Sequence, residues 1–454
     1  MTITTDIAAA DYTRTLEGGL IARWSTAADT ENIAELISSV FREKEEDEPN
    51  HHLAYLVKLL MSGKHPVMGP GDYAIVEDPN KEGNPVIAGV CLQRMEWSYE
   101  GIPFLMSRPE IVAADPAYRN RGLIRILFEF VHARSAAEGR LVDAITGIPY
   151  FYRQFGYEYA LELEGARGIS LTSIPKAKTG ETEPYTLREA TLEDVPALHN
   201  IYTHSIKNGY VITTTMDENY LRWTLEEWKE HPERIKYNST QVIINSEGTI
   251  QGWLYVQGRR RDRSVNIWRL YMAPHVNQQA IMPSLLRALQ SYGQQLPTKS
   301  PETEAFSEIK FCLGEKHDLY DVLGTMGTIN VPAYAWYIRV ADLPGFIQHI
   351  APALEKRLLN TPVEGYSGEL KLDFYRGGLR LVFEQGRLTT AENWRPTVFN
   401  YNADGGFPPL VFLKALFGYR SLNELRQAYP DVWVNNEILF NTLFPAKPSM
   451  ALVL

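Results

Sequence analysis

The stretch from Glu110 to Glu158 limits the fold of this chain more than any other, because strand-like and helix-like patterns alternate in it at short intervals. Ile111–Ala114 is a short apolar run that ends at a turn, which predicts a buried strand. In the segment 123–131, apolar residues recur at steps of three and four, so the predicted helix buries one face. Leu141–Thr146 is again short and apolar, and predicts a second buried strand.

The loop before the predicted helix carries the chemistry. Arg119, Arg121 and Arg125 place three cations within seven residues, in a chain whose formal net charge is −10. Backbone N–H groups at a helix start lack partners within the helix, and the helix dipole makes that end electropositive. Gly122 has no side chain that would keep a ligand away from this backbone. The loop is therefore predicted to cradle a pyrophosphate.

These residues resemble the acetyl-CoA loop of the GNAT N-acetyltransferases, which reads Arg/Gln-x-x-Gly-x-Gly/Ala. The chain has Arg119-Asn120-Arg121-Gly122-Leu123-Ile124, so Ile124 departs from the small residue at the last position. A second part, Phe151-Tyr152-Arg153-Gln154-Phe155-Gly156-Tyr157, resembles the family signature in which the first Tyr is the general acid. A helix and a strand of the right length separate the two parts.

The resemblance implies that acetyl-CoA is the cosubstrate and that an amine attacks its thioester directly. Tyr152 would then be the general acid that protonates the departing thiolate. By residue type alone, Tyr152 beside Phe151 and Phe155 is more typical of packing under the loop. The residues that the resemblance assigns to acetyl-CoA binding are Val112, Ala113, Ala114, Arg119, Asn120, Arg121, Gly122, Leu123, Ile124, Arg125, Gly147 and Ile148.

Length and composition exclude several classes of protein. A chain of 454 residues is too long for one core and predicts two to four domains. No apolar run approaches the roughly 18 residues of a membrane span, and the first residues do not resemble a signal peptide. Cys91 and Cys312 are the only cysteines, which favours a cytoplasmic location and predicts no metal site. The acidic balance argues against nucleic acid as a partner.

The sequence repeats its opening pattern. Leu187-Arg188-Glu189-Ala190-Thr191-x-x-Asp194 echoes Ala22-Arg23-Trp24-Ser25-Thr26-x-x-Asp29, and a polar linker at Pro175–Pro184 marks a boundary between the two copies. In the second copy the loop at His275–Ala280 has neither the arginines nor the glycine, although Tyr320–Gly324 echoes the Tyr152 segment. The second copy is therefore interpreted as a scaffold that does not bind acetyl-CoA.

The residues from Ala341 onward predict helix, strands and helices in an order that resembles a sterol-carrier-protein-like domain. Two GNAT-like copies followed by such a domain resemble the enhanced intracellular survival (Eis) acetyltransferases. The expected fold class is α+β: tandem acyl-CoA N-acyltransferase domains around mixed central sheets, then a sterol-carrier-like α/β domain. The expected domains are a catalytic domain at 1–174, a degenerate one at 175–338, and the sterol-carrier-like one at 339–454.

The resemblance to the Eis family implies a homo-oligomer, a hexamer or a trimer, and the terminal carboxylate of Leu454 as the general base. The apolar tail Ser449–Leu454 suits insertion into a cleft, but also a packed last strand. The acidic run Glu43–Glu48 is a solvated loop or an attractor for a cationic amine. Aminoglycosides, other polyamines and protein lysines are all candidate acceptors. A lipid-binding protein and a scaffold with two inert copies are the alternative functions.

Overall fold

The computed structural model describes residues 3–42, 44, 47–177, 180, 182–207, 209–226, 238–397 and 402–452. The chain divides into two compact units, and each unit joins segments that are far apart in the sequence. The first unit comprises Met1–Leu161 and Trp336–Ala446. The second unit comprises Glu162–Ala335 and Lys447–Leu454.

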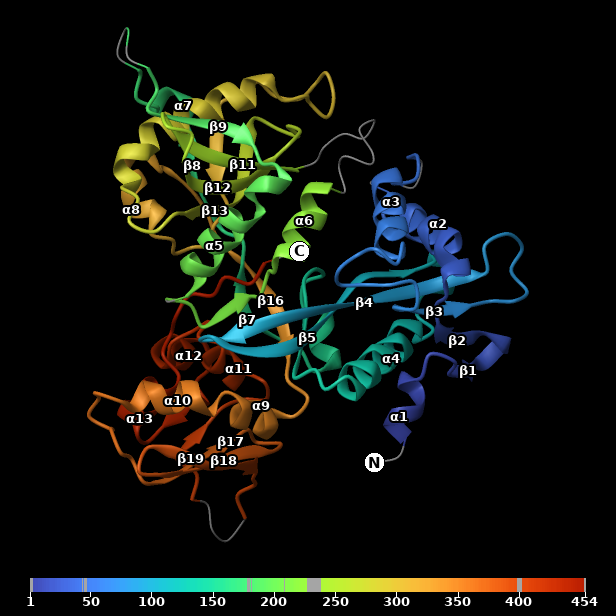
Figure 1. Ribbon diagram of the computed structural model, residues 1–454. Helices are drawn as coiled ribbons and strands as arrows, with labels where there is room; N and C mark the ends of the chain where they lie inside the picture. The colour runs from blue at the N-terminus through green and yellow to red at the C-terminus, as the bar shows by residue number, and fades with distance from the viewer. Residues whose placement is uncertain are drawn as a thin grey trace. The chain divides into compact units, whose positions relative to one another are not determined.

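The first unit is built around a mixed sheet with the strand order β1-β2-β3-β4-β5-β6-β16-β7 (Figure 1). The strands from β1 to β5 are antiparallel to their neighbours, whereas β5 and β6 are parallel. The strands are β1 (Thr13–Thr15), β2 (Ile21–Trp24), β3 (Tyr73–Glu77), β4 (Val86–Tyr99), β5 (Ile102–Ala114), β6 (Val142–Ile145), β7 (Glu158–Leu163) and β16 (Tyr334–Arg339).

Helices cover both faces of this sheet. Successive side chains of a strand point to opposite faces, and β3 shows the result. Ala74 and Val76 lie in the hydrophobic cluster formed with α4 (Leu123–Ala137), whereas Tyr73 and Ile75 lie in the cluster formed with helices α2 (Thr30–Val40) and α3 (His51–Leu60). A short helix, α1 (Ile3–Ala8), precedes β1. The predicted α+β fold class is confirmed.

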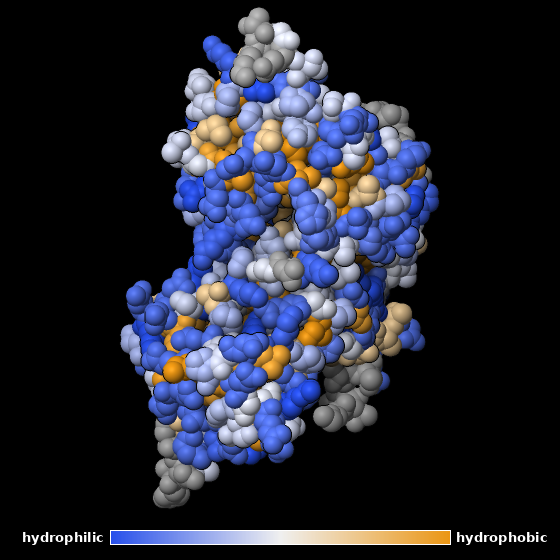
Figure 2. All heavy atoms as spheres, turned by 60° about the vertical axis from the view of Figure 1, so that its left-hand side comes forward, coloured by the Kyte–Doolittle hydropathy of each residue, from blue (hydrophilic) through white to orange (hydrophobic). Residues whose placement is uncertain are grey.

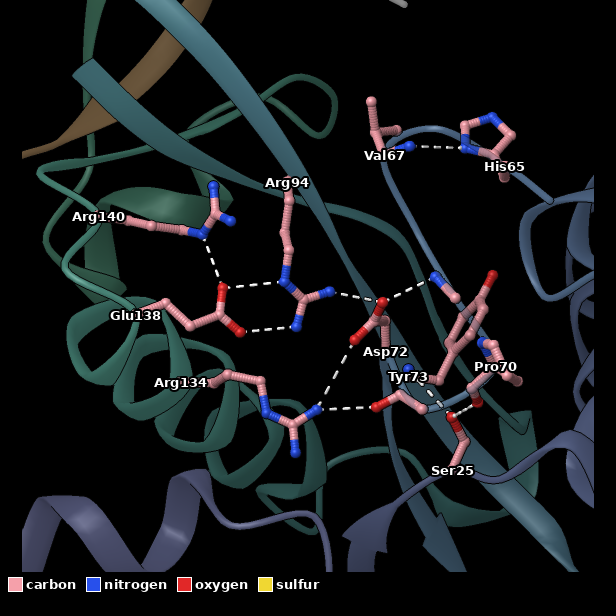
Figure 3. A network of polar contacts seen from close by, with 12 residues as sticks. Ser25, His65, Val67, Pro70, Asp72, Tyr73, Arg94, Arg134, Glu138 and Arg140 are labelled. Atoms are coloured by element: carbon pink, nitrogen blue, oxygen red, sulfur yellow. Dashed lines mark hydrogen bonds and ion pairs between the residues drawn. The ribbon is translucent and has the colours of Figure 1, made fainter. Parts of the chain in front are cut away.

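A polar network fixes the segment between α3 and β3 (Figure 3). Asp72 forms an ion pair with Arg94 of β4 (2.5 Å), and Arg94 forms a second one with Glu138 at the end of α4 (2.6 Å). Arg134 of α4 donates a hydrogen bond to the Gly71 carbonyl oxygen (2.8 Å). The segment that follows α3 is thus tied to a strand and to a helix at once.

The rest of the first unit forms a smaller sheet, with the order β19-β18-β17-β20-β21. The helix predicted after Ala341 is in fact two helices that meet at Ile350, because Pro352 lies in the first turn of the second and cannot continue the first. The elements are α9 (Leu343–His349), α10 (Ala351–Leu358), β17 (Gly368–Asp373), β18 (Gly378–Glu384), β19 (Arg387–Asn393), β20 (Gly405–Gly406), α11 (Phe412–Leu416), α12 (Leu422–Ala428), β21 (Trp433–Val434) and α13 (Glu437–Leu443).

The second unit has a mixed sheet of its own, with the order β15-β8-β14-β13-β12-β11-β9. Val242 and Ile243 of β11 belong to different hydrophobic clusters, one with α5 and α6 and the other with α7 and α8, so helices cover both faces here too. The elements are β8 (Ala166–Ser170), β9 (Tyr185–Glu189), α5 (Val195–Ile206), β10 (Ile212–Thr214), α6 (Glu218–Glu226), β11 (Asn238–Asn245), β12 (Ile250–Gln257), β13 (Ser264–Met272), α7 (Gln278–Gln295), β14 (Glu308–Phe311), α8 (Leu319–Leu323) and β15 (Ile329–Val331).

Two strands cross the boundaries that the sequence suggested. β8 falls within 1–174 but pairs with β14 and β15 of the second sheet. β16 falls largely within 175–338 but pairs with β6 of the first sheet. The division into three domains, with the sterol-carrier-like one last, stays a prediction.

The surface on the face shown in Figure 2 is mainly hydrophilic, and hydrophilic residues interrupt its hydrophobic areas. Among the helices of the described ranges, none has the length and apolarity that a membrane crossing requires.

Candidate active site

The site begins where β5 and β6 separate. The two strands pair only at Met106–Val142 and Ser107–Asp143. β5 continues to Ala114, along β4, with a bulge at Ile111, whose φ of 49° is unusual for a β-branched residue. The backbone of residues 112–114 therefore has a strand on one side and, in the described chain, no paired strand on the other. An extended ligand can pair with this open edge.

The start of α4 lies beside that open edge. Gly122 is its N-cap, with a φ of 74°, and no side chain caps the helix. A Cβ at Gly122 would meet no atom within 4 Å, so glycine serves here because of the left-handed backbone and not for lack of space. The first amide groups of α4 remain available to an anion.

Three arginines surround this helix start, and within the described residues none of them forms an ion pair with a carboxylate. The Arg119 Nε donates to the Ala114 carbonyl oxygen (3.4 Å), and the Arg121 guanidinium lies over the Tyr118 ring (4.9 Å). Arg125 donates to the Gln154 Oε1 (2.8 Å). Asp115 and Asp78 feel the charges of Arg119 and Arg121 from a distance, but no described carboxylate occupies the guanidinium groups directly, which leaves them available to an anion.

A cavity of about 620 Å³ occupies this place. All the residues predicted to bind acetyl-CoA line it, except Arg121 and Gly147. Ile124 also packs against the core beneath α4, so its bulk is partly directed away from the cavity. The lining residues that the sequence did not suggest are Val40, Phe41, Tyr118, Phe151, Gln154 and Phe155.

Tyr152 lies on a 3₁₀ helix, η4 (Phe151–Phe155), and is 3% exposed. Its hydroxyl makes no hydrogen bond with any residue that the structure describes. The hydroxyl lies beside Gly147, where an added Cβ would be 3.8 Å from it. Burial, assisted by the negative charge of Glu110, raises the pKa of Tyr152 well above its usual value. The phenol therefore keeps its proton at neutral pH and has it free to donate.

The structure adds a carboxylate that sequence reasoning missed. Glu110 ends the regular part of β5, before the bulge, and its charge acts on Tyr152. Its Oε1 accepts hydrogen bonds from Arg108 (2.8 Å) and Thr146 (2.9 Å). A carboxylate directly before the apolar run Ile111–Ala114 was the only signal of it in the sequence.

Part of the C-terminal tail and of the acidic run, both singled out in the sequence, lies outside the described residues. Leu454 and Val453 lie outside the described residues, as do Glu43, Glu45 and Glu46 of the acidic run. The tail up to Leu452 is a packed segment of the second unit: the Met450 N donates to the Ile212 carbonyl oxygen (2.7 Å). Within the part of the chain that the structure describes, no cluster of side chains could hold a metal ion.

Residues 22–160 match the acetyltransferase (GNAT) domain family. Three solved structures resemble nearly the whole chain. A protein of Enterococcus faecalis V583, described as a probable N-acyltransferase, has a TM-score of 0.67 at 15% identity, with 95% of this chain and 98% of that one covered. A GCN5-related N-acetyltransferase of Anabaena variabilis has a TM-score of 0.64 at 13% identity, with coverages of 95% and 99%.

Eis1 of Mycobacterium abscessus has a TM-score of 0.57 at 12% identity, with 95% of this chain and 97% of that one covered. At these identities the likeness concerns the fold. No curated protein matches the sequence. The GNAT domain match and the acyltransferase fold support an N-acetyltransferase, and the GNAT fold generally uses acetyl-CoA.

Proposed function

We propose that this chain uses acetyl-CoA to acetylate an amine, in the cavity between β5, α4 and η4. The observation that carries the proposal is the conjunction of three features in one cavity wall: a strand edge with no partner strand among the described residues, a helix start without a side-chain cap, and arginines that form no ion pair with a described carboxylate. Together they suit a ligand that has an extended amide-bearing arm and a pyrophosphate, and CoA has both.

Acetyl-CoA would lie with its pantetheine arm along residues 112–114 and its pyrophosphate at the start of α4. Arg119 and Arg125 line the cavity and supply charge to the phosphates. When bound, acetyl-CoA supplies the activated acetyl group. The protein residues orient it and exclude water, which brings the amine and the thioester together as reactants of a single step.

In that step the amine nitrogen forms a bond to the acetyl carbonyl carbon, and the bond from this carbon to sulfur breaks. Tyr152 donates its phenolic proton to the departing sulfur, and the amine loses a proton to a base. We propose the Leu454 carboxylate as this base, following the resemblance to the Eis family. Glu110 is the described carboxylate that could replace it.

The acceptor is proposed only as a class: a primary amine on an aminoglycoside-like molecule, a polyamine or a protein lysine. Assembly into a closed homo-oligomer, a cytoplasmic location and a sterol-carrier-like fold of residues 339–454 are part of the same proposal. The oligomer rests on the resemblance to the Eis family, the location on the cysteine content, and the sterol-carrier-like fold on the order of helices and strands after Ala341.

A coupled thiol-release assay tests the proposal across a panel of amines. We expect CoA to appear only when acetyl-CoA and an acceptor are both present. The same assay on a protein with a C-terminal extension examines the base, because an extension turns the Leu454 carboxylate into an amide. Full thermal stability without turnover would support Leu454. Full turnover would exclude Leu454, and Glu110→Gln would then be expected to abolish transfer.

A further inference from the structure

A buried ion-pair network connects the last helices of the first unit to the element that carries Tyr152. Lys414 of α11 is 7% exposed, and its Nζ lies 3.1 Å from the Glu158 Oε1. Glu158, at the start of β7, is 1% exposed, and its other carboxylate oxygen lies 2.8 Å from the Arg153 Nη2. Arg153 follows Tyr152 directly on η4. One carboxylate thus joins α11 to η4.

Lys414 also reaches the loop before η4 by a second route. Its Nζ donates to the Tyr159 carbonyl oxygen (2.9 Å), and the Tyr159 hydroxyl accepts from the Tyr150 N (3.2 Å). The hydroxyls of Tyr159 and Tyr337 are 2.6 Å apart, and Tyr337 donates to the Ile148 carbonyl oxygen (3.1 Å). The two tyrosines therefore hold the backbone on both sides of Pro149.

The loop needs such support because its backbone is strained. Tyr150 has a φ of 60°, in the left-handed region, and Gly147 has a φ of 122°. A non-glycine residue keeps such a conformation only where its surroundings impose it. The Arg153 guanidinium lies over the Tyr150 ring (5.4 Å), so the first route also meets the strained residue.

The hydroxyl of Tyr152 does not anchor itself, since it bonds to no described residue. Its position follows from its ring, which packs edge-on against Tyr337 (5.3 Å), and from its backbone between Tyr150 and Arg153. The contact with Tyr337 and the backbone on both sides of Tyr152 lead back to Lys414, whereas the contact of the ring with Phe128 of α4 (5.8 Å) does not. A buried ion pair of this kind contributes little net stability compared with apolar residues, so stability alone does not account for it.

We propose that the C-terminal part of the first unit positions the phenol of Tyr152, with Lys414 as the positioning residue that acts through Glu158 and Tyr159. The inference rests on the proposed role of Tyr152 as the general acid. It gives residues 336–446 a part in transfer that requires no lipid. It also makes correct docking of α11 a condition for an active enzyme.

Lys414→Met tests this in the full chain, alone and together with Tyr152→Phe. A misplaced acid slows the chemical step, so we expect kcat to fall by about tenfold to a hundredfold, with the KM for acetyl-CoA within about twofold of wild type. In the Tyr152→Phe protein the phenol is already absent, so adding Lys414→Met should reduce kcat no further.

Three comparisons keep the test decisive. Arg153→Met cuts the network at its more exposed end and should give the same non-additive loss if Lys414→Met fails to fold. Lys414→Arg keeps the charge and should restore part of kcat. Arg426→Met breaks the exposed ion pair of Arg426 with Glu437 (2.7 Å), on helices of the same segment, and should leave kcat unchanged.

Two results would overturn the inference while leaving Tyr152 as the acid: an unchanged kcat in folded Lys414→Met, or a loss that is as large in the Tyr152→Phe background. A Tyr152→Phe enzyme with wild-type turnover would instead refute the proposed acid, and the inference with it. The three results are distinct. The first compares wild type with Lys414→Met, the second compares Tyr152→Phe with the double variant, and the third compares wild type with Tyr152→Phe.

Discussion

The two large mixed sheets of this chain are each followed by a helix whose start is built in the opposite way. In the first, Gly122 caps α4 without a side-chain hydrogen bond. In the second, the Asn277 Oδ1 accepts from the Ala280 N (3.1 Å) at the start of α7. The second helix therefore satisfies one of its free amide groups internally, and its loop has no arginine. An anion site depends as much on the omission of a cap as on the presence of cations.

Tyr152 and Tyr320, which occupy corresponding places in the two sequence patterns, differ in the hydrogen bonds of their hydroxyls. Tyr320 lies on α8, where the sequence places the echo of Tyr152. Its hydroxyl accepts from the Leu313 N (3.3 Å) and lies 2.9 Å from the carbonyl oxygens of Phe311 and Gly314. The Tyr320 hydroxyl thus holds the backbone of residues 311–314 and is not available to donate a proton to a substrate. Tyr152 makes no such bond to the described chain.

The cavities differ in charge. A cavity of about 420 Å³ in the second unit touches Tyr320, and Glu315, Asp318 and Asp321 line it together with Arg167 and Lys316. The loop His275–Ala280 does not line this cavity, and the carboxylates that do line it disfavour a pyrophosphate, which carries the same charge. The comparison thus predicts one acetyl-CoA site per chain.

The largest difference is expected between two matched substitutions, Tyr152→Phe and Tyr320→Phe. Removal of the proposed acid should lower kcat by about a hundredfold or more, with the affinity for acetyl-CoA near wild type. Removal of the Tyr320 hydroxyl should leave kcat unchanged and lower the free energy of unfolding by about 1 kcal/mol. Steady-state kinetics and urea unfolding measure both. Equal kcat values in the two variants would show that Tyr152 is a packing residue.

Calorimetric titration of acetyl-CoA should give a single site per chain. Arg119→Ala should weaken that site by about 1.5–3 kcal/mol, the usual contribution of a charge-assisted contact. His275→Ala, in the corresponding loop of the second region, is the control and should leave the affinity unchanged. A stoichiometry of two would contradict the prediction that the second region does not bind acetyl-CoA. A wild-type affinity in Arg119→Ala would contradict the placement of the pyrophosphate at the start of α4.

The smallest expected effect is a loss of folding stability when Asp29 or Asp194 is replaced, and it should be equal in the two regions. Arg23 forms two hydrogen bonds with Asp29 (2.9 and 2.7 Å), and Arg188 forms two with Asp194 (2.6 and 2.8 Å). Burial opposes the ionisation of Asp29, but the bonds from Arg23 and Thr26 outweigh it and lower its pKa. The bond from Arg188 lowers the pKa of Asp194.

A carboxyl group with a lowered folded-state pKa stabilises the protein above its unfolded pKa of about 3.9, and this stabilisation is lost as the pH falls through the folded value. Asp29→Asn and Asp194→Asn should therefore each cost about 1 kcal/mol at pH 7. The difference from wild type should shrink below about pH 4. Unfolding by urea at several pH values checks this, and a cost in only one region would contradict the structural equivalence.

Much of the local structure could be predicted from the sequence. The helix at 123–137 begins after Gly122 and ends before Gly139, as its apolar spacing indicates. The repeated Thr-x-x-Asp pattern forms a capping box in both regions. These features depend on residues within a few positions of one another, so a linear pattern contains them. The same holds for the arginine loop and its glycine.

Because periodicity and caps are local, the helices and strands, the repeated pattern and the residues of the arginine loop could all be predicted from the order of the amino acids. Three features could not be predicted before the chain was seen folded: Glu110 acts on Tyr152, β8 and β16 pair across the suggested boundaries, and Lys414 donates a hydrogen bond to Tyr159, 255 residues away. Such contacts arise when distant segments bury apolar surface together. Their partners are set by packing, and no spacing along the chain records them.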